Sequence, residues 1–236
     1  MKQISFELFP TFYCINNLIE KINMVKPNFI SITCGKIDNY LFIKKNINFF
    51  KIKIVPHLIC NELNKIIIKI ILFIKLNIYN FLIITGDNYK LNSFYFVKNI
   101  RNLFGHTIKI FSSIYSENHK LSINLNKEIL FIYKKNKIGI NCYFSQFFFN
   151  YNIINYFLKI INKTGIKKTI IIGIFPKKKI NEVLIFSNYC KVEISNWITK
   201  NYYFFNLKNY YLKNIKNKNF HFYTFNNIKN LNYYFK

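Results

Sequence analysis

The stretch "IIIKIILFIKLNIYNFLII" at residues 66–84 decides how the chain folds, because it is apolar enough to suggest a membrane span. It is interrupted by two lysines and two asparagines, namely Lys69, Lys75, Asn77 and Asn80. Each of these side chains is costly at the centre of a bilayer. We therefore predict a buried helix followed by a buried strand, in a protein without a membrane partner.

The same combination of a short apolar run and a longer helical segment recurs along the chain. Eight apolar runs are candidate strands, and they lie at residues 2–8, 28–34, 52–58, 80–86, 108–115, 140–146, 169–175 and 219–225. Apolar runs of this length between helical segments are typical of parallel strands that are buried on both faces of a sheet. The pattern therefore predicts an α/β protein with a parallel sheet.

One polar or glycine residue marks the C-terminal edge of each candidate strand. These residues are Glu7, Thr33, His57, Asp87, Tyr115, Gln146, Gly173 and Tyr223. Successive edge residues are 24 to 31 positions apart, except for a last gap of 50. Eight units of this spacing predict a single-domain (β/α)8 TIM barrel over residues 1–236, with an extra helical segment before the last strand. An open doubly wound sheet is the alternative, but the sequence lacks the Gly-rich fingerprint that normally follows an early strand of such a sheet.

The barrel prediction brings these edge residues together, because the C-terminal ends of barrel strands share one mouth where catalysis takes place. Glu7 stands out among them, since the chain has only 9 acidic residues against 35 basic ones. A carboxyl group enclosed by Phe6, Leu8 and Phe9 would have its pKa raised by desolvation, which suits a general acid. A salt bridge to one of the many lysines is the structural alternative.

The net charge of +26 suggests a nucleic-acid-binding protein at first. Nearly all of this charge is lysine spread along the chain, and Arg101 is the only arginine, although base and phosphate recognition favours the arginine fork. Lysine, asparagine, isoleucine, phenylalanine and tyrosine are residues that AT-rich codons supply, so we attribute the charge to base-composition drift. The five cysteines form no CxxC pair, which favours reduced thiols in a cytoplasmic protein over disulfides or a metal site.

Eight segments, in order, resemble methylenetetrahydrofolate reductase of the bacterial, single-domain flavoprotein type. They are "SFELFP" at 5–10, "PNFISITCG" at 27–35, "PHLIC" at 56–60, "ITGD" at 84–87, "YSENH" at 115–119, "SQFFFN" at 145–150, "GIFP" at 173–176 and "FHFYTFN" at 220–226. Each segment is weak alone, but together they cover nearly the whole chain at a spacing that fits a barrel. "SFELFP" and "SQFFFN" are the most specific of them.

The resemblance implies an FAD-dependent oxidoreductase that reduces 5,10-methylenetetrahydrofolate to 5-methyltetrahydrofolate with NADH or NADPH. Hydride would pass from the nicotinamide to the flavin and then to the folate, so the kinetics would be ping-pong. The product would supply methyl groups for methionine synthesis. The resemblance also suggests a homo-oligomer, and neither nucleic acid nor a membrane is an expected partner.

The resemblance also implies roles for single residues. Glu7 matches the general acid that protonates a folate nitrogen, so that the five-membered ring opens to an N5 iminium ion. Asp87 matches an aspartate near the flavin and the folate that would stabilise this cation, with a helix N-cap as its alternative. Gln146 matches a glutamine that hydrogen-bonds the pterin and the nicotinamide in turn, with capping of the next helix as its alternative. Phe186 matches a ligand-stacking phenylalanine, with a core position as its alternative, and Tyr223 is assigned to the same substrate site.

A further set of residues falls at positions that bind FAD in the family. This set is Thr33, His57, Gly86, Asp87, Tyr115, His119, Glu128 and Lys135. Lys135 and His119 would meet the diphosphate, whereas Tyr115 and His57 would contact the adenosine and ribityl parts. The alternative for a lone histidine is a packed structural residue.

Three positions depart from the family pattern. Thr85 and Asn227 stand where the family usually has arginines, and Cys34 stands where it has a tyrosine. Lost arginines near the flavin and the folate would weaken the binding of one or both. Two other functions therefore stay open: a barrel that has lost its cofactor, and a basic RNA-binding or ribosome-associated protein.

Overall fold

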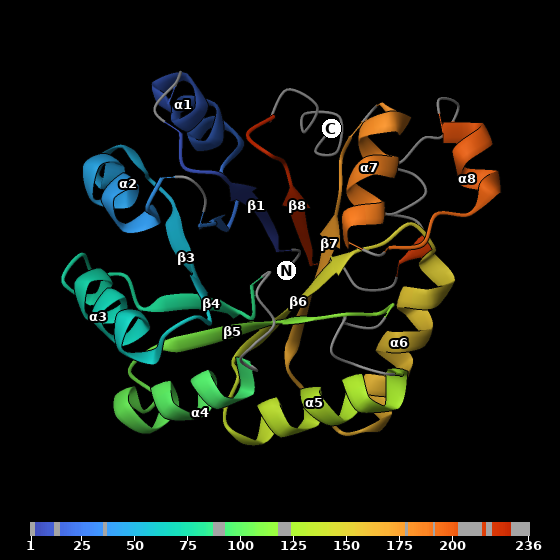
Figure 1. Ribbon diagram of the computed structural model, residues 1–236. Helices are drawn as coiled ribbons and strands as arrows, with labels where there is room; N and C mark the ends of the chain where they lie inside the picture. The colour runs from blue at the N-terminus through green and yellow to red at the C-terminus, as the bar shows by residue number, and fades with distance from the viewer. Residues whose placement is uncertain are drawn as a thin grey trace.

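A computed structural model describes residues 3–11, 15–34, 37–86, 93–117, 124–177, 179–190, 192–202, 214–215 and 219–227. Eight strands in this part of the chain form a closed barrel in the order β1 to β8, and each pair of neighbours is parallel. Pairing of β1 with β8 closes the barrel, and the helices surround it (Figure 1). The predicted (β/α)8 TIM barrel is confirmed.

The bounds of the strands agree with the predicted runs to within three residues at each end. The strands are β1 (Ile4–Leu8), β2 (Phe29–Ile32), β3 (Lys53–Ile59), β4 (Asn80–Ile84), β5 (Lys109–Ile114), β6 (Cys142–Phe147), β7 (Thr169–Ile174) and β8 (Phe220–Tyr223). The helices are α1 (Ile15–Val25), α2 (Asn39–Asn46), α3 (Leu63–Ile74), α4 (Ser93–Phe104), α5 (Leu125–Lys137), α6 (Tyr151–Lys163), α7 (Ile180–Cys190) and α8 (Asn196–Asn201). A short 3₁₀ helix, η1 (Ile47–Phe49), follows α2. Helix α8 is the extra helical segment that was expected before the last strand.

The apolar stretch at residues 66–84 folds as the sequence predicts. It contains most of α3 and all of β4. Helix α3 buries Ile66, Ile70 and Phe73, which lie three or four positions apart and so share one face. No helix in the described part of the chain is long and apolar enough to cross a membrane.

Polar residues cap the N-terminal ends of several helices. Asp38 Oδ1 accepts hydrogen bonds from the backbone N–H groups of Tyr40 and Leu41 at the start of α2. Asn124 and Asn150 play the same part at the starts of α5 and α6. Such caps satisfy N–H groups that have no partner inside the helix. The starts of these helices are thereby stabilised by local side-chain hydrogen bonds.

Alternation along the strands divides the apolar side chains between two cores. The larger core includes Phe6 and Leu8 and lies between the strands and the helices. The smaller core consists of strand residues alone, and its buried members are Phe29, Val55, Leu82, Cys142, Phe144 and Ile171. Because successive strand residues point to opposite faces, this second group fills the inside of the barrel. It forms the floor beneath the polar residues at the mouth.

Candidate active site at the barrel mouth

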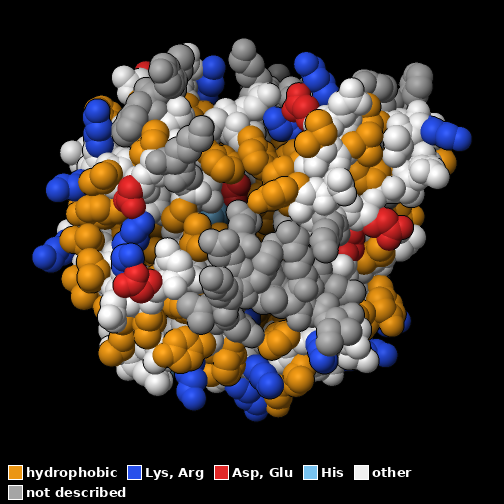
Figure 2. Space-filling view, in the orientation of Figure 1, with side chains coloured by type: hydrophobic (Ala, Val, Ile, Leu, Met, Phe, Trp, Pro, Cys, Tyr) orange, Lys and Arg blue, Asp and Glu red, His pale blue; other side chains and the backbone are white. Residues whose placement is uncertain are grey.

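The C-terminal ends of the strands bring several of the predicted site residues to one face of the barrel. Glu7 is on β1, His57 on β3, Gln146 on β6 and Tyr223 on β8. Figure 2 shows a central hollow on this face, with an acidic side chain inside it and hydrophobic side chains around it. The predicted convergence of residues that are far apart in sequence is therefore present.

Glu7 lies inside the barrel and is only 7% exposed. Burial raises the pKa of its carboxyl group from 4.5 to about 8. The sequence-based reason for this shift was partly wrong, because Phe6 and Leu8 belong to the outer core and lie on the opposite face of β1. The interior of the barrel, and not the neighbouring apolar residues of the strand, desolvates the acid.

The backbone of Glu7 is fixed by the strands on both sides of it. Its register partners are Ser31 on β2 and Tyr223 on β8. The Thr224 hydroxyl also donates a hydrogen bond to the Glu7 carbonyl oxygen at 2.6 Å. No salt bridge to Glu7 is found among the described residues. The carboxyl group is thus buried without a lysine partner there, which is the state that a general acid needs.

A buried polar group that the sequence did not reveal lies directly below Glu7. The Ser5 hydroxyl is 2.8 Å from Nδ1 of His221, and the Ser31 hydroxyl is 3.3 Å from Nε2. Burial lowers the pKa of His221, so its imidazole is neutral. The sequence signal for this group is the alternation of side chains along a strand. Ser5 and His221 lie two positions before Glu7 and Tyr223, and so point to the same face of the sheet. The group could be recognised only once the pairing of β1 with β8 was known.

Among the site residues, His57 shows the clearest sign of contact with a bound ligand. It is 3% exposed, and neither of its ring nitrogens has a hydrogen-bond partner in the described part of the chain. Burial lowers its pKa to about 3, so the ring is neutral at physiological pH. Buried polar atoms without a partner are costly, and they are rarely left so in a native protein. Both nitrogens are therefore available to a bound molecule.

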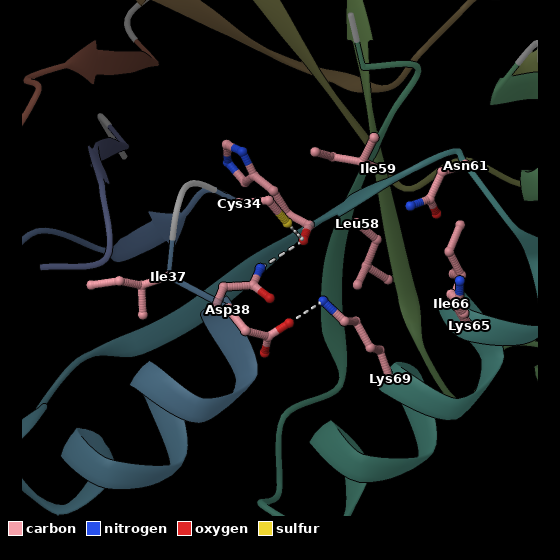
Figure 3. A pocket seen from close by; sticks show the side chains of 11 residues that line it. Cys34, Ile37, Asp38, Leu58, Ile59, Asn61, Lys65, Ile66 and Lys69 are labelled. Carbon is pink, nitrogen blue, oxygen red and sulfur yellow. Dashed lines mark hydrogen bonds and ion pairs between the residues drawn. The ribbon is translucent and has the colours of Figure 1, made fainter. Parts of the chain in front are cut away.

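A cavity of about 330 Å³ lies next to His57, between α2 and α3 (Figure 3). The His57 carbonyl accepts hydrogen bonds from Asn39 Nδ2 at 2.8 Å and from the Cys34 thiol at 3.3 Å. Asp38 and Lys69 point toward each other across the cavity and form an ion pair of 2.7 Å. Cys34 therefore helps to fix the strand end that carries His57. Sequence reasoning had assigned no role to Asn39 or to this ion pair.

Gly86 and Tyr115 follow the ends of β4 and β5. Gly86 has φ +79°, and a Cβ there would lie 2.4 Å from Cγ2 of Ile59. Both facts require glycine at this strand end. Tyr115 is half-buried, and Thr33 is buried with its N–H bonded to the Leu8 carbonyl at 3.0 Å. Asp87 and His119, the other residues predicted near them, lie outside the described residues.

Glu128 and Lys135 lie on the buried face of α5. Lys135 Nζ donates to the Ser113 carbonyl at 3.4 Å, near the C-terminal end of β5. Burial lowers the pKa of Lys135, while the charges of Glu128 and Cys60 oppose this shift. Both charged side chains are thus inside the protein, beside strands β3 and β5. Their predicted contact with FAD stays a prediction.

Phe186 belongs to an aromatic cluster next to β6 and β7. Its ring stacks on Phe147 and Phe175, with ring centroids 5.4 Å and 5.0 Å away. It also meets the edge of Phe225 at 4.7 Å. The side chain is only half-buried, so one part of the ring remains accessible. The structure therefore gives Phe186 a packing role, and its role in stacking on a ligand remains a prediction.

Comparison with known proteins identifies the family to which the chain belongs. The family model described as methylenetetrahydrofolate reductase matches residues 1–233. The chain belongs to the methylenetetrahydrofolate reductase family. The 5,10-methylenetetrahydrofolate reductase of Buchnera aphidicola subsp. Baizongia pistaciae (strain Bp) is 26% identical over 214 residues, covering 83% of this chain and 72% of that protein. The resemblance noted in the sequence is confirmed.

Solved structures agree with the barrel fold. A protein from Clostridium thermocellum that binds two copies of 5-methyl-5,6,7,8-tetrahydrofolic acid superposes with a TM-score of 0.68 at 15% identity, covering 94% of this chain and 88% of that one. The sialic acid aldolase of Ruminococcus gnavus superposes with a TM-score of 0.54 at 9% identity, covering 78% of this chain and 65% of that one. At these identities the likeness establishes the barrel fold alone.

Proposed function

We propose that the chain reduces 5,10-methylenetetrahydrofolate to 5-methyltetrahydrofolate, in an FAD- and NAD(P)H-dependent reaction that supplies methyl groups for methionine synthesis. The observation that carries the proposal is Glu7, a buried carboxyl group at the barrel mouth whose pKa is raised to about 8. Membership of the methylenetetrahydrofolate reductase family and the folate-binding structural relative support it.

Glu7 supplies the proton that the substrate needs. The methylene carbon of the substrate is held between two nitrogens, and neither nitrogen leaves readily as an anion. Protonation of one nitrogen by Glu7 opens the five-membered ring and leaves an N5 iminium ion that can accept a hydride. With a pKa near 8, the carboxyl group is protonated at neutral pH and still acidic enough to donate.

The residues at the mouth fit a polar, planar cofactor such as FAD. The two unpaired ring nitrogens of His57 offer hydrogen bonds, and Gly86 lets the backbone approach closely. Thr33 and Tyr115 would complete the site, with Lys135 at the diphosphate and Glu128 at a hydroxyl or amine of the ribose or adenine. Asp87 and His119 are proposed on their sequence motifs alone. Bound FAD would act as a two-electron carrier between NADH or NADPH and the folate, in two successive half-reactions.

The other side of the mouth would bind the folate. Gln146 on β6 supplies a polar group, and the rings of Tyr223 on β8 and Phe186 on α7 supply apolar surface. Lysines near the mouth would favour anionic ligands, since a positive surface potential attracts them. Lys177 is one such lysine, and it pairs with Glu182 at 3.1 Å. Its Nζ lies 5.7 Å from the ring centroid of Phe225, which contacts Phe186.

Separate measurement of the two half-reactions tests the proposal. The purified protein should show flavin absorbance, either as isolated or after FAD is added. In the variant Glu7→Gln, reduction of the flavin by NADH should keep its rate, whereas transfer to methylenetetrahydrofolate should fall at least about a hundredfold, the usual contribution of a general acid. The matched control is Glu20→Gln, because Glu20 is exposed on α1.

Three results would contradict the proposal. A protein that FAD cannot reconstitute would indicate a barrel that has lost its cofactor. Equal damage to both half-reactions in Glu7→Gln would exclude the role of Glu7 as a general acid. Binding of RNA that weakens steeply with salt, in a protein without flavin, would favour the nucleic-acid alternative that the net charge of +26 suggests.

A further inference from the structure

Strand β6 contains one extra residue next to the mouth. Phe144 pairs with Ile171 and Phe147 pairs with Gly173, so three steps along β6 oppose two steps along β7. This is a β-bulge, and Ser145 and Gln146 are the residues within it. Bulges in parallel sheets are rare, and bulges near active sites commonly redirect a side chain.

Hydrogen bonds from side chains replace the ladder bonds that the bulge disrupts. The Gly173 N–H donates to the Ser145 hydroxyl at 2.9 Å, and that hydroxyl donates to the Gln146 carbonyl at 2.9 Å. The Phe147 N–H donates to Oε1 of Gln146 at 3.1 Å. Because an N–H group can bond only to the oxygen of the amide, this contact fixes which way round the Gln146 amide lies. The Nε2 group of Gln146 therefore remains as a donor for a ligand, while Oε1 keeps one further lone pair.

Tyr223 stabilises the bulge through a hydrogen bond that reaches across β7. Its hydroxyl donates to the Ser145 carbonyl at 2.9 Å, although β7 lies between β8 and β6. The ring can cross β7 only because residue 173 is glycine. A Cβ there would lie 2.6 Å from Cε2 of Tyr223 and 2.5 Å from the Ser145 carbonyl oxygen. Both polar groups of Ser145 are therefore engaged, one by β7 and the other by β8.

We infer that Ser145 and Tyr223 are positioning residues that hold the bulge and so present the Nε2 group of Gln146 to the ligand as a hydrogen-bond donor. The ligand group that Gln146 recognises is then an acceptor, such as a ring carbonyl oxygen or an unprotonated ring nitrogen. Folates and nicotinamides both carry such an atom, so one fixed donor can serve both ligands in turn. This inference rests on the proposed function for the identity of the ligands, but the fixed bulge does not depend on it.

The experiment compares Ser145→Ala and Tyr223→Phe with two matched controls. Ser112→Ala removes a buried strand hydroxyl that has no partner among the described residues. Tyr143→Phe removes a phenol that donates to the Ile132 carbonyl at 3.1 Å, in the outer core away from the mouth. Ser145→Thr is the rescue variant, because it keeps a hydroxyl group at position 145.

Two readouts separate positioning from stability. In Ser145→Ala and Tyr223→Phe, the KM for the folate and for NADH should rise about tenfold, the equivalent of one hydrogen bond, while kcat changes less. Exchange of the Gly173 amide hydrogen for deuterium should also accelerate in Ser145→Ala, and Ser145→Thr should restore both properties. The two controls should keep wild-type KM values, whatever their unfolding temperatures.

The outcomes distinguish this inference from the proposed function. If the wild-type protein reduces the folate and Ser145→Ala and Tyr223→Phe keep its KM values, the inference is wrong. If the wild-type protein does not reduce the folate, the proposed function fails, and the hydrogen exchange of Gly173 still decides whether Ser145 holds the bulge. Unchanged exchange in Ser145→Ala would overturn the inference in either case.

Discussion

Glu7 and Tyr223 are register partners on β1 and β8, so an acid of raised pKa and a phenol stand side by side at the point where the barrel closes. Burial raises the pKa of Tyr223 well above 10, and the neighbouring Glu7 raises it further. Burial alone therefore keeps Glu7 largely protonated at neutral pH, and Tyr223 stays neutral beside it. The relationship has consequences for stability as well as for catalysis, because both groups are desolvated inside the barrel.

The raised pKa of Glu7 predicts that stability falls as the pH rises from about 4.5 to about 8. In this range the unfolded chain has released the proton while the folded protein keeps it, because the pKa is 4.5 in the first and about 8 in the second. The free energy of unfolding then decreases by up to about 1.4 kcal/mol per pH unit. Below pH 4.5 both states are protonated, and above pH 8 both are ionised, so this contribution is constant there.

Urea unfolding of the wild type and Glu7→Gln at pH 5.5 and pH 8 measures this effect. The variant cannot ionise, so it should become more stable relative to the wild type as the pH rises. Glu117, whose pKa burial raises to about 7, titrates in both proteins and cancels in the difference. The exposed variant Glu20→Gln should follow the wild type, and an equal pH slope in all three proteins would contradict the assignment of the buried proton to Glu7.

Arg101, the only arginine of the chain, is predicted to be a structural residue. Its guanidinium group donates to the carbonyls of Gly105, Ile108 and Gly139 and to Oδ1 of Asn141. These acceptors lie at the N-terminal ends of β5 and β6, opposite the catalytic mouth. A lysine cannot reproduce this fork of donors. Arg101→Lys should therefore lower the free energy of unfolding by about 2–3 kcal/mol.

Denaturant unfolding of Arg101→Lys tests this prediction, with Lys98→Ala on the exposed side of α4 as the control. At a temperature where the variant remains folded, its KM values and flavin content should equal those of the wild type. A loss of FAD or folate binding without a loss of stability would show that Arg101 acts on the site, which the structure does not predict.

The sequence predicted the barrel because its signals are local, whereas the details of the mouth depend on pairing between strands. The runs at 52–58 and 80–86 could be recognised by their own composition, and they became β3 and β4. The bulge in β6 could not be recognised in this way, because the sequence "CYFSQFFF" has no local feature that marks the extra residue. Similarly, the contact of Ser5 with His221 joins residues 216 positions apart, and it exists only because the barrel closes. Motif resemblance singled out Glu7 and Gln146 as candidates, but not the residues that contact them.

Gly173 is predicted to be intolerant of alanine for steric reasons alone. Its φ is not in the left-handed region, yet a Cβ would meet the Ser145 carbonyl oxygen at 2.5 Å and Tyr223 Cε2 at 2.6 Å. Gly173→Ala should lower the free energy of unfolding by about 2–3 kcal/mol, because neither neighbour can move freely. Gly165→Ala is the control, since Gly165 has φ +76° but no atom within 4 Å of its Cβ position, and strain alone should cost about 1–2 kcal/mol there. A loss in Gly173→Ala no larger than that in Gly165→Ala would mean that the contacts with Ser145 and Tyr223 do not explain the glycine.

His57 is predicted to weaken the cofactor-free protein while it strengthens cofactor binding. Its buried ring nitrogens have no partner in the described part of the chain, so His57→Leu should raise the free energy of unfolding without FAD by about 1 kcal/mol. The same change should weaken FAD binding about tenfold or more, because the ligand then loses its hydrogen bonds to the imidazole. Thermal unfolding without FAD and a fluorescence titration with FAD measure the two effects, with the exposed His106→Leu as the control. If His57→Leu destabilised the cofactor-free protein and left the affinity for FAD unchanged, His57 would be a packing residue and the proposed cofactor contact would be wrong.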